Sequence, residues 1–200
     1  EALDHPEVVG LVIGTRPDCV NQEILQLLKK ICHDKYLSIE FGLESIHDET
    51  LIRINRGHDV QAFINALKLA KIYQIPVGVH LIFGFPWEAK IGIPTANFLN
   101  QLDVNFVKIH NLQIVKNTIM GNDYLKKPFP LLSIDQYLNE VIDFIAHLSP
   151  QIIIQRLGGD CQHDILLASG FHESSKELKS ILLKKLEEQH LYQGVSKLPH

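Results

Sequence analysis

Short apolar stretches alternate with amphipathic stretches along most of this sequence, and this rhythm restricts the fold more than any other feature. Strands are predicted at 8–13, 36–43, 77–83, 104–109 and 152–155. Helices are predicted at 21–34, 60–73 and 92–102, the second of these with Asp59 as its N-cap, and later helices are capped by Ser133 and Ser174. Residues 116–132 are expected to be irregular. Strand–helix alternation produces parallel strands joined by right-handed crossovers. The sequence therefore predicts an α/β fold of parallel βα units.

The stretch Val77–Glu88, VGVHLIFGFPWE, reads as a strand that ends at Gly84 and opens into a loop. Alternation places His80, Ile82 and Gly84 on the face opposite the valines. Other strands also end in polar residues or glycine, and the carboxyl ends of parallel strands are where α/β proteins bind ligands. Charges inside a flat, fully packed sheet would be costly. A curved sheet with a polar concave face, part of a barrel, is therefore favoured.

Composition excludes several classes of protein. A net charge of −4 argues against nonspecific electrostatic binding of nucleic acid, although it leaves room for a local basic patch. No apolar run reaches the ~20 residues of a membrane span, and no secretory signal is visible. The odd number of widely spaced cysteines, 3, suits a reducing compartment, so a cytoplasmic location is expected. Because the sequence begins with Glu1, its natural start is expected to lie upstream.

Five motifs follow the predicted elements in order. They are GTRPD at 14–18, EFGLES at 40–45, NRGHD at 55–59, HLIFGFPWE at 80–88 and KIH at 108–110. Together, over roughly residues 8–160, the series resembles the radical SAM proteins of the YhcC-like group, related to the coproporphyrinogen oxidase and elongator-subunit branch. At Trp87 the sequence departs from the family, which commonly has glycine there. Each motif is weak alone, and the ordered series is specific.

The resemblance implies part of a (β/α)6 partial TIM-type barrel that holds S-adenosylmethionine and a [4Fe–4S] cluster, the pair that generates a 5′-deoxyadenosyl radical. The cluster requires three thiolates from a CxxxCxxC loop, and Cys19, Cys32 and Cys161 lack that spacing. We therefore expect residues 1–160 to begin at the third barrel strand and 161–200 to form a helical extension, with the cluster loop upstream. The piece alone is expected to hold no iron and to be inactive. A degenerate paralogue without a cluster is the second explanation.

Site residues are carried over by the resemblance onto matching positions. Glu44 and Ser45 would meet the methionyl amino group and ribose, and Ile82 and Gly84 would pack on the adenine. The full set of cofactor-binding candidates is Arg16, Glu44, Ser45, Ile82, Gly84, His110 and Leu112, the last through its backbone. The catalytic candidates are His80, Lys108 and Glu40. No metal ligand is predicted, because no histidine pair has zinc-like spacing with a third partner.

Ordinary structural roles compete with these assignments. Arg16 can pair with Asp18, the carboxylates Glu40 and Glu44 can pair with Arg16 or Lys108, and His80 can be a hydrogen-bonded core histidine. The segments 55–59 and 156–160 have no role that the sequence reveals.

Other functions stay open. One is a binding or regulatory module that keeps the barrel without radical chemistry. Another is a hydrolase or aldolase-like enzyme that uses Glu40 or Lys108, which would require one of them to titrate near neutrality. Expected partners are an electron donor and an unknown substrate, with nucleic acid among the candidates, and no membrane. The uncovered edge at strand 8–13 predicts an edge-to-edge dimer of the piece.

Overall fold

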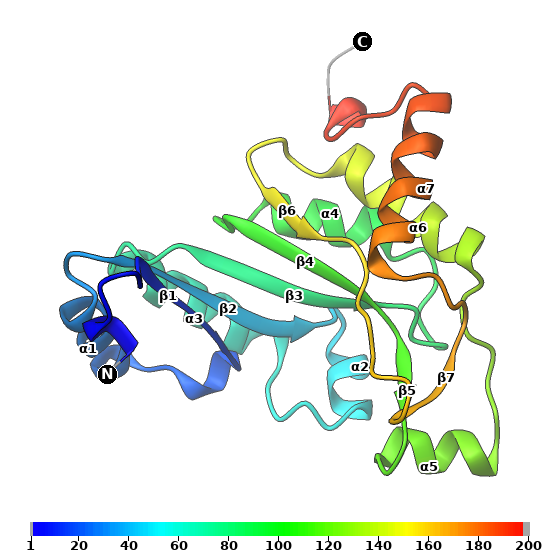
Figure 1. Ribbon diagram of the computed structural model, residues 1–200, viewed down its shortest axis with the longest axis horizontal. Helices are drawn as coiled ribbons and strands as arrows, with labels where there is room; N and C mark the ends of the chain where they lie inside the picture. The colour runs from blue at the N-terminus through cyan, green and yellow to red at the C-terminus, as the bar shows by residue number, and fades with distance from the viewer. Residues whose placement is uncertain (1, 198–200) are drawn as a thin grey trace. The chain divides into compact units, whose positions relative to one another are not determined.

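The computed structural model describes residues 2–197 of the 200-residue chain (Figure 1). Its strands are β1 (Gly10–Thr15), β2 (Tyr36–Glu44), β3 (Val77–Phe83), β4 (Phe106–Asn111), β5 (Gln113–Val115), β6 (Ile153–Arg156) and β7 (Leu166–Ser169). Its helices are α1 (Gln22–Ile31), α2 (Asp48–Arg53), α3 (Val60–Ile72), α4 (Gly92–Asn100), α5 (Ile119–Lys126), α6 (Ile134–His147) and α7 (Ser175–Glu188). Single 3-10 turns occur at Ala2–Asp4, Pro17–Cys19 and Val195–Lys197.

The main sheet has five strands in the order β1-β2-β3-β4-β6. The first two pairings are parallel, with Gly14 opposite Glu40 and Gly42 opposite His80. A separate antiparallel sheet joins β5 to β7. The prediction of an α/β fold with parallel βα units is confirmed. Two compact units divide the chain, the first being residues up to 81 with 102–107 and the second being 82–101 with 108 onward.

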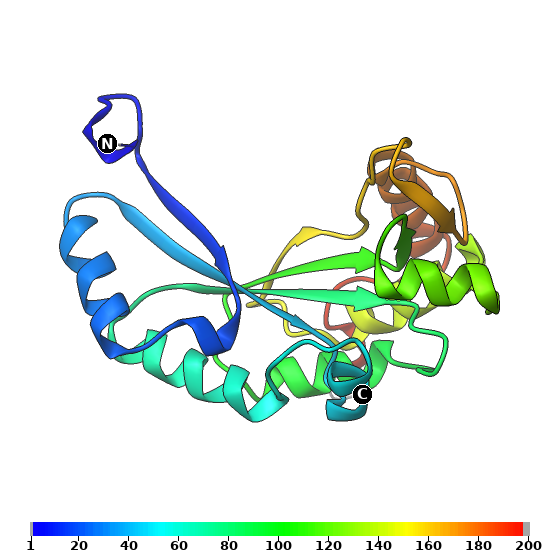
Figure 2. The same cartoon turned by 90° about the horizontal axis from the view of Figure 1, so that it is seen from below.

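The core of the first unit lies between its strands and α3. Figure 2 shows α1 and α3 along the same side of β1 and β2. Phe41 of β2 meets Phe63 of α3 edge to face, with 6.3 Å between ring centroids. Both rings are fully buried, and each such ring contributes about 1.5–3 kcal/mol by leaving water. The predicted N-cap of α3 is confirmed, because the Asp59 carboxylate accepts a hydrogen bond from Ala62 N.

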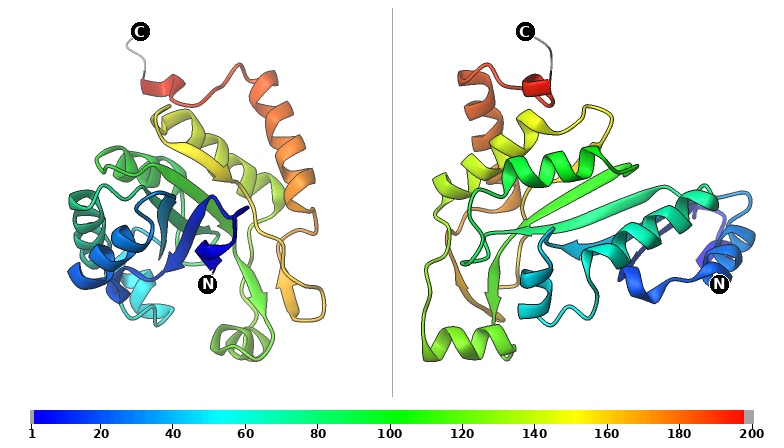
Figure 3. Two further views of the ribbon diagram at one scale, coloured as in Figure 1. Left: turned by 60° about the vertical axis from the view of Figure 1, so that its left-hand side comes forward. Right: turned by 180° about the vertical axis from the view of Figure 1, so that it is seen from behind.

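In the second unit, α6 and α7 begin at the capping boxes that the sequence predicts. Ser133 and Gln136 exchange hydrogen bonds at the start of α6, as Ser174 and Glu177 do at the start of α7. Phe144 of α6 contacts Phe83 edge to face at 5.7 Å. Figure 3 shows β5 and β7 side by side, with α5 directly after β5. These contacts give the second unit its own core.

Several predicted elements differ from the structure. The segment 116–132 was expected to be irregular but contains α5, where the Thr118 hydroxyl accepts a hydrogen bond from Gly121 N. The elements α2, β5 and β7 were not predicted, and the last of these lies within 161–197 together with α7. On α1, Leu25 is buried, whereas Ile24, Leu27 and Ile31 are exposed. The predicted domain boundary at residue 160 stays a prediction.

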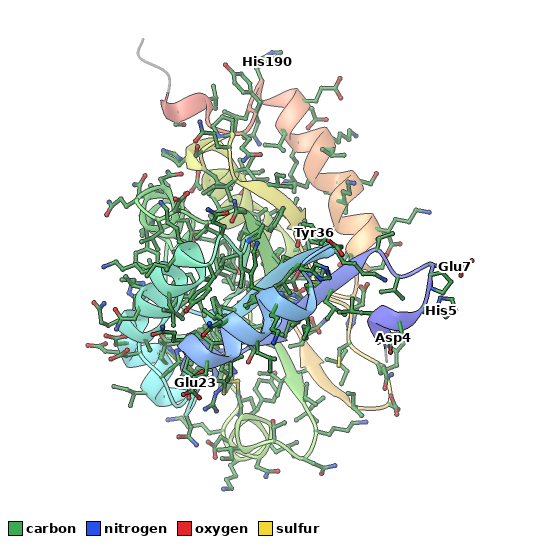
Figure 4. All side chains as sticks on the ribbon, turned by 90° about the vertical axis from the view of Figure 1, so that its left-hand side faces the viewer. Asp4, His5, Glu7, Glu23, Tyr36 and His190 are labelled. Atoms are coloured by element: carbon green, nitrogen blue, oxygen red, sulfur yellow. The ribbon has the colours of Figure 1, made fainter. Side chains whose placement is uncertain are left out.

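Strand β1 lies at one end of the strand order, as predicted. Its outward side chains are exposed, with 58% of Val12 accessible. The lead-in before it is tied to the start of β2, because Lys35 Nζ donates to Leu3 O and Val8 O at 2.6 and 2.7 Å. Figure 4 labels residues of this lead-in and Tyr36, the first residue of β2. The edge-to-edge dimer stays a prediction.

None of the helices in the described part of the chain combines the length and the apolar character that a bilayer crossing requires.

Candidate functional site

The C-terminal end of β2 carries the most strained residue among the predicted site positions. Glu44 has a φ of 69°, in the left-handed region that side chains other than glycine rarely adopt. The pairing with β3 shifts register between Gly42 and Glu44, which is a β-bulge. Ser45 follows at 4% exposure, and its Oγ accepts a hydrogen bond from His47 N at 3.1 Å. The bulge therefore turns the Glu44 side chain away from simple strand alternation.

Cations surround the Glu44 carboxylate. Arg56 Nη2 lies 2.9 Å from Glu44 Oε1, and both side chains are largely buried. Burial raises the pKa of Glu44, while the positive charges of Arg56, His80 and His58 oppose that rise. The partner of Glu44 is Arg56, and the sequence did not predict this pair. Its only sequence signal is the NRGHD motif at 55–59, which the resemblance singled out without a role.

A second carboxylate contact, to a histidine, lies within the same unit. Glu40 is 8% exposed, and its Oε2 lies 2.8 Å from His80 Nε2. Their strands are paired, which brings these two catalytic candidates into direct contact. A carboxylate fixes the orientation and tautomer of the imidazole that it contacts. The pair can therefore hold a proton at a defined nitrogen, and its catalytic role stays a prediction.

Arg16, at the end of β1, pairs with its near neighbour Asp18. The guanidinium donates through Nε and Nη2 to the two carboxylate oxygens at 2.9 and 2.5 Å. This contact raises the pKa of Arg16 and lowers that of Asp18. The guanidinium also lies over Gly57, where a Cβ would be 3.4 Å from Arg16 Nη1. The structural alternative for Arg16 is therefore confirmed, and its cofactor contact stays a prediction.

In the second unit, the end of β3 is apolar. Gly84 has a φ of 109°, and a Cβ there would lie 3.4 Å from Leu132 Cδ1 and 3.6 Å from Leu112 Cβ. The cavity beside it, lined also by Phe171, has a volume of about 10 Å³, which is room for one water. Leu112 N donates to Phe83 O at 2.9 Å, so that amide is already used. The predicted adenine contacts at Gly84 and at the Leu112 backbone stay predictions.

The end of β4 meets the glycine loop that follows β6. Asn111 is 6% exposed, and its Oδ1 accepts a hydrogen bond from Gly159 N at 3.0 Å. A Cβ on Gly159 would overlap the His110 ring, which explains a glycine at this position. Ile82, Lys108 and His110 are all half-buried on alternate positions of their strands, as predicted. The sequence did not predict Asn111 as a site residue, since an asparagine at a strand end has no signal of its own.

The cysteines do not form an iron site. Cys19 is exposed, Cys32 is buried and Cys161 is half-buried. Among residues 2–197, no group of three or more histidine, cysteine, aspartate or glutamate side chains is arranged to hold a metal ion. The prediction that this chain lacks the thiolates of a [4Fe–4S] cluster rests on the sequence, and the donor set found here does not fit such a cluster.

Comparison with known families identifies the superfamily of this chain. The profile of the Radical SAM superfamily matches residues 2–90, and the profile of the Radical SAM C-terminal domain matches residues 104–188. This chain belongs to the radical SAM superfamily. Proteins of this superfamily generally use S-adenosylmethionine and a [4Fe–4S] cluster. Membership in the superfamily therefore supports, in general terms, an enzymatic function.

Individual relatives refine the placement to the YhcC-like group. The chain is 42% identical to the uncharacterized protein MJ0486 of Methanocaldococcus jannaschii over 161 residues, which are 80% of this chain and 50% of that protein. It is 34% identical to YhcC of Escherichia coli over 170 residues, which are 84% of this chain and 55% of that protein. This chain therefore spans about half the length of these relatives.

A solved structure supports the fold independently. Archaeal Elp3 of Methanocaldococcus infernus, with an N-terminal deletion, superposes with a TM-score of 0.79 at 24% identity, over 92% of this chain and 43% of that chain. This likeness shows a shared fold alone and carries no residue roles. The fold class that the sequence predicted is confirmed.

Proposed function

We propose that the protein carrying this chain binds S-adenosylmethionine and, together with a [4Fe–4S] cluster, performs radical chemistry on a substrate yet to be identified. Bound together, the cluster and S-adenosylmethionine would supply a 5′-deoxyadenosyl radical. The match of both superfamily profiles to this chain carries the proposal. The matched residues are about half of each relative's length, so this proposal concerns the activity of the whole protein.

The residues present suit the organic cofactor. S-adenosylmethionine offers an ammonium group, a ribose diol and an adenine. Glu44 supplies a largely buried carboxylate in a strained backbone position, and such strain persists where it is used. Ser45 supplies a hydroxyl beside it. Within the second unit, Ile82 and Gly84 offer an apolar side chain and open backbone, which suit an aromatic ring.

The cluster does not fit the residues of this chain, and no step is assigned to it. In this proposal its thiolates belong to the part of the longer relatives that residues 1–200 do not cover. Within this chain, Glu40 and His80 remain the residues able to hold and move a proton near a substrate, through the contact of 2.8 Å.

The decisive test uses the whole natural protein, reconstituted with iron and sulfide without oxygen. With reductant present, S-adenosylmethionine is expected to yield 5′-deoxyadenosine, measured by liquid chromatography. Glu44→Gln is the informative variant, because it keeps the size of the side chain and removes the charge. Lys68→Gln, an exposed change on α3, is the matched control. Binding without cleavage would favour the regulatory module, and absence of both would overturn the proposal.

A further inference from the structure

An open cavity lies at the N-terminal end of β3, and none of the predicted site residues lines it. Its volume is about 320 Å³, within the range of small-molecule sites, which is about 300–1,000 Å³. The lining comes from the second half of α3, the turn into β3 and the segment before β4, all within the first unit. We call it the α3–β3 cavity.

Its position separates the α3–β3 cavity from the end of β2. Val77, the first residue of β3, pairs with Ile39 of β2, whereas Glu44 lies five residues further along that strand. Five residues of a strand span about 15 Å. Because α/β proteins bind their ligands at the carboxyl ends of the strands, a cavity at the amino end of β3 lies outside the site proposed for S-adenosylmethionine.

Apolar side chains form the floor of the cavity. Leu67, Ile75 and Val77 line it at 4, 3 and 1% exposure, and Pro76 lines it as well. The backbone at the start of the strand is already paired, because Val77 N donates to Asn105 Oδ1 and Asn105 N donates to Val77 O, both at 2.9 Å. The floor therefore suits a hydrocarbon group, which buries no unpaired polar atom there.

Charges of both signs lie at the opening of the cavity. Lys71 Nζ of α3 contacts Asp103 Oδ2, and the two side chains are 65 and 63% exposed. An ion pair this exposed contributes little to stability. A ligand that carries both an anion and a cation can therefore replace each partner of the pair at little loss.

Gln74 lines the same cavity from a backbone conformation that glutamine rarely adopts. Its φ is 54°. At this turn Gln74 N donates to Lys71 O and Ile75 N donates to Ala70 O, at 2.9 and 3.0 Å, which is the Schellman motif that ends a helix. Glycine is the usual residue at this position of the motif. Glutamine adds an exposed side-chain amide that glycine lacks.

We propose that the α3–β3 cavity binds a free α-amino acid with an apolar side chain. The ligand's side chain lies on the floor formed by Leu67, Ile75 and Val77. Its carboxylate accepts hydrogen bonds from Lys71 Nζ and the Gln74 amide, and its ammonium group donates to the Asp103 carboxylate. A zwitterion matches both charges at the opening, whereas a ligand with one charge leaves the other without its counterion. This site goes beyond the proposed function and does not depend on it.

The test uses four probes that differ by one group each from the expected ligand or represent it. L-leucine carries all three groups, 4-methylpentanoate lacks the ammonium, 3-methylbutylamine lacks the carboxylate and glycine lacks the side chain. Binding to the whole natural protein is measured by titration calorimetry. L-leucine is expected to bind about tenfold more tightly than each of the other three, as for the loss of one charge-assisted hydrogen bond or one buried apolar group.

Variants assign each ligand group to its residue. Lys71→Gln is expected to weaken L-leucine and 4-methylpentanoate about tenfold and to leave 3-methylbutylamine within about twofold. Asp103→Asn is expected to weaken L-leucine and 3-methylbutylamine instead. Gln74→Gly keeps the turn, so the fold is retained, and is expected to weaken L-leucine about threefold. Lys68→Gln, an exposed change on the same helix, is the control that is expected to change no probe.

One further variant separates this cavity from the end of β2. Glu44→Gln is expected to leave the affinity for L-leucine unchanged, and a loss there would overturn the assignment to the α3–β3 cavity. Equal effects of Lys71→Gln and Asp103→Asn on every probe would overturn the recognition of a zwitterion. Absence of L-leucine binding to the unaltered protein would overturn the site itself, whether or not that protein cleaves S-adenosylmethionine.

Discussion

The ends of β2 and β3 both leave the strand through a residue with positive φ, but the two residues differ in kind. At the end of β2 the residue is Glu44, with a φ of 69°, and its carboxylate is held by Arg56. At the end of β3 it is Gly84, with a φ of 109°, and its neighbours Leu112 and Leu132 are apolar. Glycine adopts this conformation without steric cost, whereas glutamate does not.

This difference shows how each strand end keeps its backbone conformation. The end of β2 accepts strain in order to present a charged side chain, so its order depends on cations that come from elsewhere in the chain. The end of β3 presents bare backbone, so its conformation depends on the small space that its neighbours leave at position 84. The first should respond to charge and pH, and the second should respond to size.

The largest effect is expected when the cation beside Glu44 is removed. Arg56→Met leaves a largely buried carboxylate without its cation and leaves the Gly42 carbonyl with only the His58 contact, which should lower the free energy of unfolding by about 2–4 kcal/mol. Urea denaturation at neutral pH measures it. Arg16→Met is the control, because the Arg16–Asp18 pair is more exposed, and this change should lower the free energy of unfolding far less.

The pH dependence of that loss has a definite sign. Burial raises the pKa of folded Glu44 above its unfolded value, so its ionisation destabilises the fold as the pH rises. Removing Arg56 raises this pKa further. The difference between Arg56→Met and the unaltered protein should therefore be smallest near pH 4, about where unfolded glutamate titrates, and should grow toward neutrality. A loss independent of pH would mean that the guanidinium acts only through Gly42.

A smaller effect is expected at the end of β3. Gly84→Ala forces a side chain into positive φ and against Leu132 Cδ1 at 3.4 Å. The expected cost is about 1–3 kcal/mol in unfolding free energy, with little change between pH 5 and 8. Gly14→Ala provides the matched control, since nothing lies within 4 Å of its Cβ position. Equal stability of the two variants would contradict the steric account of Gly84.

Local signals explain which parts of the fold were predictable. Strand β3 was placed at 77–83, as observed, because its apolar alternation is continuous. Asp59, Ser133 and Ser174 were identified as caps because a cap acts over three residues. Helix α5 was missed because Lys126-Lys127-Pro128 and Pro130 favour a loop at its C-terminal end, while its cap, Thr118, has no capping-box partner.

The site was less predictable than the fold for a physical reason. Glu44 was expected from the resemblance, but its partner Arg56 approaches only after the chain has passed through α2. The side chain that covers Gly84 comes from Leu132, 48 positions later in the sequence. Sequence periodicity does not predict such long-range contacts, because they depend on packing between elements. The resemblance singled out the motif at 55–59, but the sequence does not reveal which atoms its side chains contact.

The smallest effect is expected at a third polar turn, the loop after β6 in the second unit. Asp160 accepts hydrogen bonds from Ser175 N and Ser175 Oγ at 2.8 and 2.7 Å, and these bonds lower its pKa. A depressed pKa stabilises the fold above the unfolded value of about 3.9 and loses that effect as the pH falls through the folded value. Because Asp160 is exposed, Asp160→Asn should cost only about 0.5 kcal/mol near neutrality.

That difference should shrink as the pH falls through the lowered pKa of Asp160, because the carboxyl then becomes neutral like the amide. Thermal unfolding of the unaltered protein and of Asp160→Asn at pH 3 and pH 7 measures this difference in stability. Asp164→Asn is the control, because Asp164 is exposed and also precedes α7 in the sequence. A loss as large as that of Arg56→Met would mean that charge orders the second unit as strongly as it orders the end of β2. A loss confined to a fraction of a kcal/mol, and confined to higher pH, would leave the Glu44–Arg56 pair at the end of β2 as the place where charge decides the conformation of the backbone.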